Sequence, residues 1–141
     1  MATYHFDKLF STRDADQLIP TLELLIRDLQ SQATTLRERI QDLVRADENV
    51  DSMRLSQIIE THPELGPVTT RMAEIATQIE SLGCLLKDID LGLVDFPSEL
   101  GDEVVFLCWQ IGEPRVAAWH RVETGFGDRQ PLPGARGTYL N

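Results

Sequence analysis

Seven candidates for binding metal ions or transferring protons stand out in the segment from residue 88 to residue 123: Asp88, Asp90, Asp95, Cys108, Glu113, His120 and Glu123. Carboxylate, thiolate and imidazole groups are the usual ligands of zinc and the usual acids and bases of enzymes. The chain contains no Cys-x-x-Cys, no His-Glu-x-x-His and no calcium-binding loop, so no motif assigns a role to them. The predicted ligands of a candidate divalent-metal site are Asp95, Cys108, Glu113 and His120.

Each of these groups also has an ordinary structural role. His120 shares a face of a predicted strand with apolar residues, a place where hydrogen-bonded core histidines are common. Cys108 lies among apolar neighbours, and a lone buried cysteine usually packs as a small hydrophobic residue. Asp88 and Asp90 precede Gly92, and aspartates beside glycines are typical turn residues. The residue types alone leave both interpretations open.

The register of one predicted β-hairpin decides whether Cys108 and His120 can meet. Its two strands are predicted over Glu103–Ile111 and Arg115–Val122. A four-residue loop places Cys108 opposite Trp119 and turns His120 to the other face of the sheet. A three-residue loop places Cys108 directly across from His120, with Cβ atoms about 4.5–5.5 Å apart. The turn residues fit either loop, so both registers stay open.

A small-ligand site near the same strands is a second candidate, formed by Trp109, Glu113, Trp119, His120 and Arg129. The guanidinium of Arg129 can hold an anion through two hydrogen bonds, or it can pair with one of the many nearby carboxylates. The two tryptophans face each other across the hairpin in one register and cover opposite faces in the other. In that second register, one indole can be exposed to a ligand or a partner.

The elements that must position these groups begin with a long helix. Apolar residues recur every three or four positions and predict a helix from about Thr12 to Arg45, which would be about 50 Å long. Ser11 and Asp14 form a capping-box-like start, and Pro20 is expected to bend the axis. The predicted buried stripe is Ala15, Leu18, Leu22, Leu25, Leu29, Gln32, Leu36, Ile40 and Leu43.

A return arm follows the loop Asp47–Asp51 and completes an antiparallel, coiled-coil-like helical hairpin over about 12–82. A second apolar stripe begins at Leu55 and is interrupted at residues 62–67, where two prolines and a glycine stop one helix and start another. Gly83 is the expected C-terminal cap of the last helix. Two helices bury little by themselves, so we expect two chains to pair through them as a homodimer; the alternative is a sheet folded over the stripe.

The pattern changes after Gly83 to short segments rich in Val, Leu, Phe and Trp, separated by Gly and Pro. The segments are Cys84–Leu86, Leu91–Phe96, Glu103–Ile111 and Arg115–Val122. They predict a small antiparallel sheet over about 83–129, with an irregular tail over 130–141. The sequence thus predicts one α+β domain over 1–141, with helices first and strands second.

Charge and composition narrow the classes of function. The chain has 141 residues, with 23 acidic and 13 basic side chains and a formal charge of −10. This sign disfavours nucleic acid and anionic membrane as partners. Segment 88–114 holds seven acidic residues and no Lys or Arg, which suits internal charge pairing or a cation site. Two cysteines and no membrane-length apolar run indicate a soluble protein of the reducing cytoplasm.

The second half of the chain also resembles a known family. The run Gly83-Cys84-Leu85-Leu86-Lys87-Asp88-Ile89-Asp90-Leu91-Gly92-Leu93-Val94-Asp95-Phe96-Pro97 is similar to the signature of the prokaryotic domain-of-unknown-function family number 2203. The same pattern continues through Leu107-Cys108-Trp109, Gly112-Glu113, Trp119-His120, Gly125-Phe126 and Arg129. The resemblance implies a soluble bacterial or archaeal protein, and it implies no activity.

Three classes of function remain. The first is a dimeric module that binds a partner or a small ligand of unknown identity. The second is a metal-dependent enzyme whose site lies at the C-terminal sheet and whose cofactor would be a divalent metal ion. The third is a coiled-coil scaffold, in which residues 1–82 associate by themselves and the sheet is dispensable.

Overall fold

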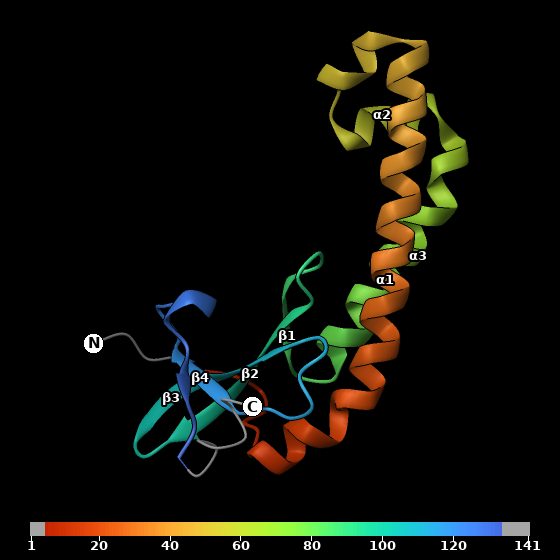
Figure 1. Cartoon of the computed structure of the whole chain (residues 1–141). Helices are drawn as coiled ribbons and strands as arrows, with labels where there is room; N and C mark the ends of the chain where they lie inside the picture. Colours follow the sequence, from red (N-terminus) through yellow and green to blue (C-terminus); the bar gives the residue numbers. More distant parts are fainter. Residues whose placement is uncertain (1–4, 134–141) are drawn as a thin grey trace.

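A helical stalk and a five-stranded sheet form the protein, in a computed structural model that describes residues 5–133 (Figure 1). The helices are α1 (Thr12–Ala46), η1 (Glu48–Ser52), α2 (Leu55–Thr61), η2 (Pro63–Leu65), α3 (Gly66–Ser81) and η3 (Phe126–Asp128). The strands are β1 (Leu85–Asp88), β2 (Leu93–Leu100), β3 (Glu103–Gln110), β4 (Ala118–Arg121) and β5 (Gln130–Pro131). This arrangement confirms the predicted α+β class. No helix among residues 5–133 is both long and apolar enough to cross a membrane.

The long helix α1 begins and bends where the sequence indicates. Ser11 Oγ accepts the backbone N–H of Asp14 at 3.0 Å, and the Asp14 carboxylate accepts the N–H of Ser11, which together form a capping box. Pro20 lies inside the helix, and the axis changes direction along the red-to-orange part of α1 in Figure 1. Beyond this bend, α1 runs along α3 as the stalk.

The buried stripe of α1 is rotated relative to the predicted one. Ile19, Ile26 and Ala33 are buried, whereas Leu18, Leu25 and Gln32 lie half-buried beside them. Consecutive helical residues are about 100° apart, so a wide apolar arc does not reveal which of its rows lies at the centre. The complete buried face is Ala15, Ile19, Leu22, Ile26, Leu29, Ala33 and Leu36.

The return arm confirms the predicted hairpin and its interruption. The 3₁₀ turn η2 separates α2 from α3, and Pro67 is the second residue of α3, where its missing N–H leaves no hydrogen bond unmade. Gly83 adopts a φ of 99°, and its N–H donates to the carbonyl of Glu80 at 3.0 Å. The helix therefore ends where only glycine turns the chain without strain.

The sheet is antiparallel throughout, in the order β1-β2-β3-β4-β5. β2 continues through Pro97 to Leu100, although the sequence pattern predicts its end at Phe96. Pro97 is tolerated because β1 pairs with β2 only as far as Asp95, so no strand needs a donor from it. The carbonyl of Pro97 accepts the N–H of Phe10 at 2.7 Å instead. At the other edge, residues 130–131 form β5 where an irregular tail is predicted; residues 134–141 lie outside the described range.

The two faces of the sheet differ in what they contact. Val94, Phe96, Leu107 and Trp109 pack with α1 and α3 in the main core. Because side chains alternate along a strand, the residues between them point to the opposite face, away from the stalk. That opposite face carries the candidate site.

Candidate metal centre

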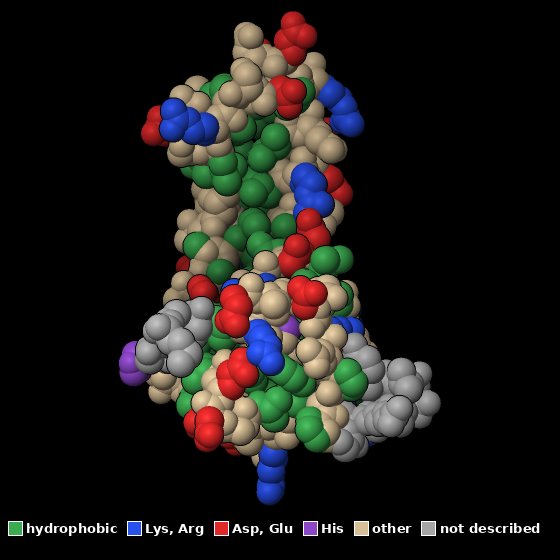
Figure 2. Space-filling model, turned by 90° about the vertical axis from the view of Figure 1, so that its left-hand side faces the viewer, with side chains coloured by type: hydrophobic (Ala, Val, Ile, Leu, Met, Phe, Trp, Pro, Cys, Tyr) green, Lys and Arg blue, Asp and Glu red, His purple; other side chains and the backbone are tan. Residues whose placement is uncertain are grey.

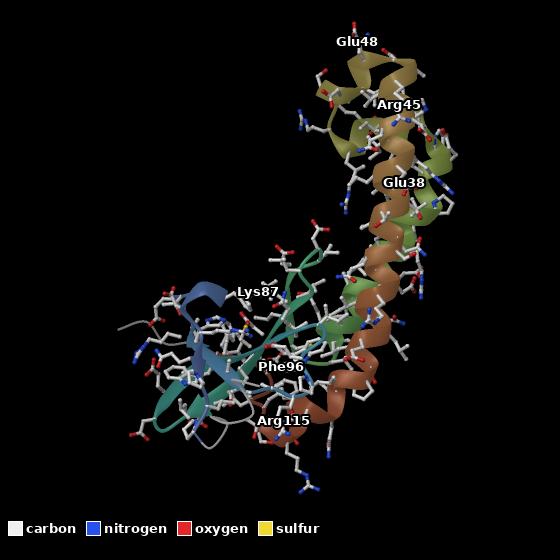
Figure 3. All side chains as sticks on the ribbon, viewed as in Figure 1. Glu38, Arg45, Glu48, Lys87, Phe96 and Arg115 are labelled. Carbon is white, nitrogen blue, oxygen red and sulfur yellow. The ribbon has the colours of Figure 1, made fainter. Side chains whose placement is uncertain are left out.

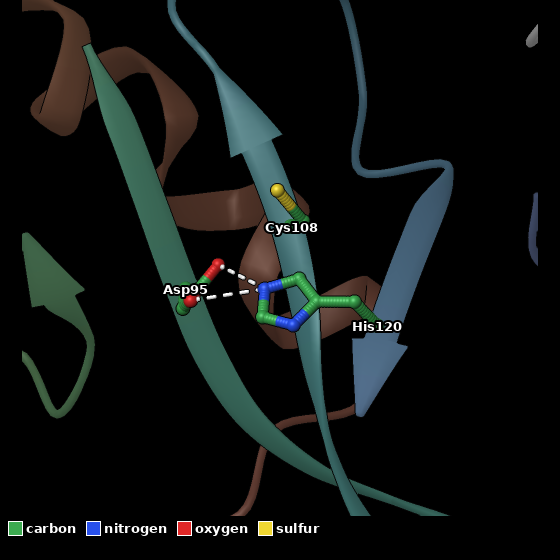
Figure 4. A group of neighbouring side chains, drawn as sticks. All are labelled: Asp95, Cys108 and His120. Atoms are coloured by element: carbon green, nitrogen blue, oxygen red, sulfur yellow. Dashed lines mark hydrogen bonds and ion pairs between the residues drawn. The ribbon is translucent and has the colours of Figure 1, made fainter. Parts of the chain in front are cut away.

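Three neighbouring strands bring Asp95, Cys108 and His120 together. Asp95 on β2 lies directly opposite Cys108 on β3, and Phe106, two residues before Cys108, lies opposite His120 on β4. All of these side chains therefore share the face of the sheet that points away from the helices. Figure 4 shows the three side chains together. One ligand atom from each of them lies within 4.8 Å of the others.

Neither of the two predicted hairpin registers occurs. Cys108 pairs with Ala118, which shifts the pairing beyond both alternatives and still places His120 on the face of Cys108. The connection is longer than predicted because Glu113 closes a separate turn: its N–H donates to Gln110 O, and its Oε1 accepts the N–H of Gln110 at 2.7 Å. The following residues then run beside α1, where Val116 N–H donates to Asp16 Oδ1 at 2.7 Å.

The three side chains are almost entirely removed from solvent. Exposed fractions are 3% for Asp95, 1% for Cys108 and 2% for His120. Nε2 of His120 lies 3.0 Å from Oδ1 and 3.1 Å from Oδ2 of Asp95. Such a buried cluster needs its charges paired, because an isolated buried charge is costly.

The hydrogen bonds of His120 determine where its protons are. Nδ1 lies 2.7 Å from the backbone carbonyl of Arg121. A carbonyl only accepts, so Nδ1 carries a proton and donates it. Nε2 then faces the carboxylate of Asp95, and one proton lies between these two groups. His120 is thus held with Nε2 directed into the cluster.

Burial sets the protonation of the other two groups. Burial raises the pKa of Asp95, and the charge and hydrogen bond of His120 oppose that rise. Burial, followed by the negative charge of Asp95, raises the pKa of Cys108 to about 12. Cys108 is therefore a thiol at neutral pH. Both nitrogens of His120 are already hydrogen-bonded, so no base is free to activate this thiol as a nucleophile.

The other predicted site residues lie elsewhere in the described part of the chain. Glu113 accepts a hydrogen bond from Arg129 at 3.0 Å as well as from Gln110, so its carboxylate holds the turn and is not part of the cluster. Trp109 is fully buried on the helix-facing side, and its indole N–H donates to the carbonyl of Glu113. Trp119 is half-buried against the same core. The two tryptophans are therefore on the face opposite His120.

The remaining aspartates of the predicted set have turn roles. Asp88 Oδ1 accepts the N–H of Leu91 at 2.8 Å, and Asp90 pairs with Arg37 of α1 at 3.1 Å. These contacts join the β1–β2 turn to the stalk. The interpretation of Asp88 and Asp90 as turn residues agrees with these contacts.

A residue that the sequence pattern does not single out lies beside the cluster. The ammonium nitrogen of Lys87 is 5.2 Å from the centroid of the Phe106 ring, and that ring packs edge-on against His120 at 5.6 Å. Phe6 packs against the same Phe106 ring at 5.5 Å. The signal that could have identified Lys87 is its position immediately before an acidic segment without Lys or Arg.

The comparison with protein families identifies a family that this chain matches. The model of a family described as an uncharacterized conserved protein (DUF2203) matches residues 8–132, a range that contains all three members of the cluster. No curated protein and no solved structure matches the chain.

Proposed function

The chain belongs to the DUF2203 family of uncharacterized conserved proteins, and we propose that it is a metal-dependent enzyme whose metal ligands are Asp95, Cys108 and His120. The observation that carries this proposal is the convergence of three ligand atoms within 4.8 Å on one buried face of the sheet. Thiolate, imidazole and carboxylate together suit a borderline-soft ion, Zn²⁺ above all.

The hydrogen bond from His120 Nδ1 to the Arg121 carbonyl supports this assignment. Histidines that bind metals usually donate their other ring N–H to a carbonyl or a carboxylate, which fixes the tautomer and the orientation of the ring. Here that bond is 2.7 Å long and leaves Nε2 directed toward Asp95 and Cys108. The imidazole is oriented as a ligand by the backbone of its own strand.

The number of ligands indicates the type of centre. Three protein ligands leave one position of a tetrahedral ion open, which is the arrangement of catalytic zinc sites and not of closed structural sites. An ion at such a position supplies Lewis-acid activation of a water molecule or a carbonyl group. A thiolate ligand requires a reduced cysteine, so we place the protein in the cytoplasm; both cysteines are free thiols.

Proton release is the test of this proposal. Metal binding requires Cys108 as a thiolate, Asp95 as a carboxylate and a bare Nε2 on His120, so it displaces the thiol proton and the proton shared by Asp95 and His120. We expect Zn²⁺ to bind with 1:1 stoichiometry, to release about two protons per ion at neutral pH, and to gain affinity as pH rises.

Isothermal titration calorimetry in buffers of different ionisation enthalpy measures this proton count. Protein purified without a His-tag avoids a competing site. Titration with Co²⁺ adds a second readout, because a cobalt–thiolate bond gives intense charge-transfer absorption. A chain that binds neither ion more tightly than exposed carboxylates do would refute the metal centre.

A second candidate function, association with another copy of the chain, is favoured by the distal part of the stalk. There, half-buried apolar side chains surround a small separate core; we call them the distal stalk surface, made of Ile40, Leu43, Val44, Met53, Ile59 and Met72. Figure 2 shows this apolar strip along the groove between the helices. No third helix layer covers it among residues 5–133.

The rim of this surface suits a second copy as its occupant. A hollow of about 260 Å³ is lined by Leu43 and Leu65, with Arg39, Asp42 and Glu64 around them. A twofold axis brings a patch against itself, so a rim with both charge signs can pair Arg39 of one chain with an acidic residue of the other. We therefore propose a homodimer formed through the stalk.

Sedimentation equilibrium at micromolar concentration tests the dimer. We expect a mass twice the 15.9 kDa of the chain. Leu43→Glu should give a monomer, because it places a charge within the distal stalk surface. Leu24→Glu is the matched control, since Leu24 is 75% exposed on the same helix and outside that surface. A monomeric wild-type chain at tens of micromolar contradicts this proposal.

A further inference from the structure

We propose that the open position of the metal centre takes a small oxyanion, and that Lys87 is the residue that recognises its negative charge. This inference rests on the proposed metal-dependent function. It names the chemical class of the ligand and adds a specificity-determining residue outside the ligand set.

The backbone of β1 places Lys87 on the face of the site. Leu85 pairs with Asp95 and Leu86 pairs with Val94, but the register then shifts, so that Asp88 pairs with Leu93 and Lys87 is the extra residue of a β-bulge. Bulges change the direction of a side chain and are frequent beside active sites. Leu86 packs into the helix-facing core, so the next side chain, that of Lys87, points to the opposite face.

The ammonium group of Lys87 lies beside the cluster, against the ring of Phe106. It is 5.2 Å from the centroid of Phe106, whose ring packs against His120, and its charge acts on the buried carboxylate of Asp95. Figure 3 shows Lys87 extending from β1 toward the strands that carry the cluster. Lys87 is exposed and forms no ion pair with the residues described at 5–133. Its charge is therefore available to a ligand.

The sum of charges favours an anion at this place. A divalent ion is balanced by the thiolate of Cys108 and the carboxylate of Asp95, and the bound imidazole of His120 is neutral. The ammonium of Lys87 then leaves the site with one excess positive charge. An oxyanion would neutralise this charge, and the compact ammonium of Lys87 on its flexible stem is suited to bind one of its oxygens.

Lysine is rare in this chain, and the other lysine provides a control for Lys87. Only two of the 13 basic residues are lysines, Lys8 and Lys87. Both lie over a phenylalanine ring, Lys8 at 4.6 Å from the centroid of Phe10 and Lys87 at 5.2 Å from that of Phe106. Phe10 belongs to the helix-facing core and not to the cluster, so Lys8 is a matched lysine outside the site.

The experiment uses the full-length chain loaded with Co²⁺ and titrated with acetate, with visible absorption as the readout. Acetate should change the cobalt spectrum saturably, and acetamide, its uncharged isostere, should not. Lys87→Gln should weaken acetate binding about 10- to 100-fold, while Co²⁺ should bind at least as tightly as in the wild type because a neighbouring positive charge is removed. Lys87→Arg should remain within a few-fold of the wild type, and Lys8→Gln should have no effect.

The outcomes separate this inference from the function on which it rests. If the wild-type chain binds no Co²⁺, the metal centre and the oxyanion site both fail. If Co²⁺ binds but acetate has no effect, or if acetate binds Lys87→Gln as tightly as the wild type, the metal centre stands and the role of Lys87 is overturned. An equal response to acetamide likewise overturns charge recognition.

Discussion

Cys108→Ser is expected to lower Zn²⁺ affinity about 100-fold or more while the chain remains folded. The change replaces a soft thiolate with an alcohol that does not ionise at neutral pH, and loss of even an outer-shell partner costs about 10- to 100-fold. The Cys108 thiol is hydrogen-bonded to Asp95, and a serine hydroxyl can donate in its place, so the buried cluster keeps its hydrogen bonding. Calorimetric titration measures the affinity, and proton release should fall from about two to about one per ion.

Cys84→Ser is the matched control for this variant. Cys84 is the only other cysteine of the chain, is fully buried, and donates from Sγ to the carbonyl of Ile79 at 3.3 Å. It packs in the helix-facing core, away from the cluster. The control should therefore bind Zn²⁺ as the wild type does. Equal affinity of Cys108→Ser and the wild type would remove Cys108 from the ligand set.

His120→Ala is expected to lower the free energy of unfolding by about 3–5 kcal/mol at pH 8 in the presence of a chelator. The variant leaves the carboxylate of Asp95, which is 3% exposed, without its partner. Removal of one member of a buried pair costs more than the pair itself contributes, because the other charge stays buried. Urea denaturation followed by circular dichroism measures the loss.

The same variant should recover stability in acid. His120 lowers the pKa of Asp95 against the rise caused by burial, so its removal raises that pKa further above the unfolded value. A carboxyl group whose folded pKa is raised favours the folded state when protonated, and this contribution is lost as pH rises from the unfolded toward the folded pKa. The cost of His120→Ala should therefore be smaller near pH 4 than at pH 8.

Asp95→Asn provides the comparison that isolates the buried charge. The side-chain amide keeps the shape of aspartate and can donate to Nε2, since Nδ1 already carries the proton given to Arg121 O. This variant should lower the free energy of unfolding by only about 1 kcal/mol. If His120→Ala lowers the free energy of unfolding at pH 8 no more than Asp95→Asn does, the buried Asp95–His120 pair does not carry the charge that we assign to it.

The helical half was predictable because its signals are local. The capping box depends on Ser11 and Asp14, three residues apart, and the helix stops depend on Pro67 and Gly83 at single positions. Each signal acts within one or two turns of chain. The predicted helical hairpin and its interruption are therefore confirmed. The buried stripe of α1 depends on what the helix packs against, and the prediction placed its centre on Leu18, Leu25 and Gln32 instead of the neighbouring Ile19, Ile26 and Ala33.

The sheet was predictable in kind but not in register. β2 continues through Pro97 because β1 does not pair beyond Asp95, and the carbonyl of Pro97 accepts the N–H of Phe10, 87 positions earlier. The β3–β4 pairing depends on the turn that Glu113 closes and on Asp16 of α1, which holds the residues that follow. Contacts between residues so distant in the chain are absent from any local pattern, so loop rules alone allowed two registers and the fold adopts a third.

The sequence by itself determined the candidate ligand set, Asp95, Cys108, Glu113 and His120, in the acidic second half of the chain. Only the tertiary structure decided that Asp95, Cys108 and His120 share a buried face, that Glu113 belongs to a turn, and that Lys87 lies against the ring of Phe106 beside the cluster. The reason is the twofold alternation of strands, in which a shift of one residue reverses the face of every side chain. The sequence specifies the type of each residue, but the face of the sheet that a side chain occupies depends on pairing between strands that are distant in the chain.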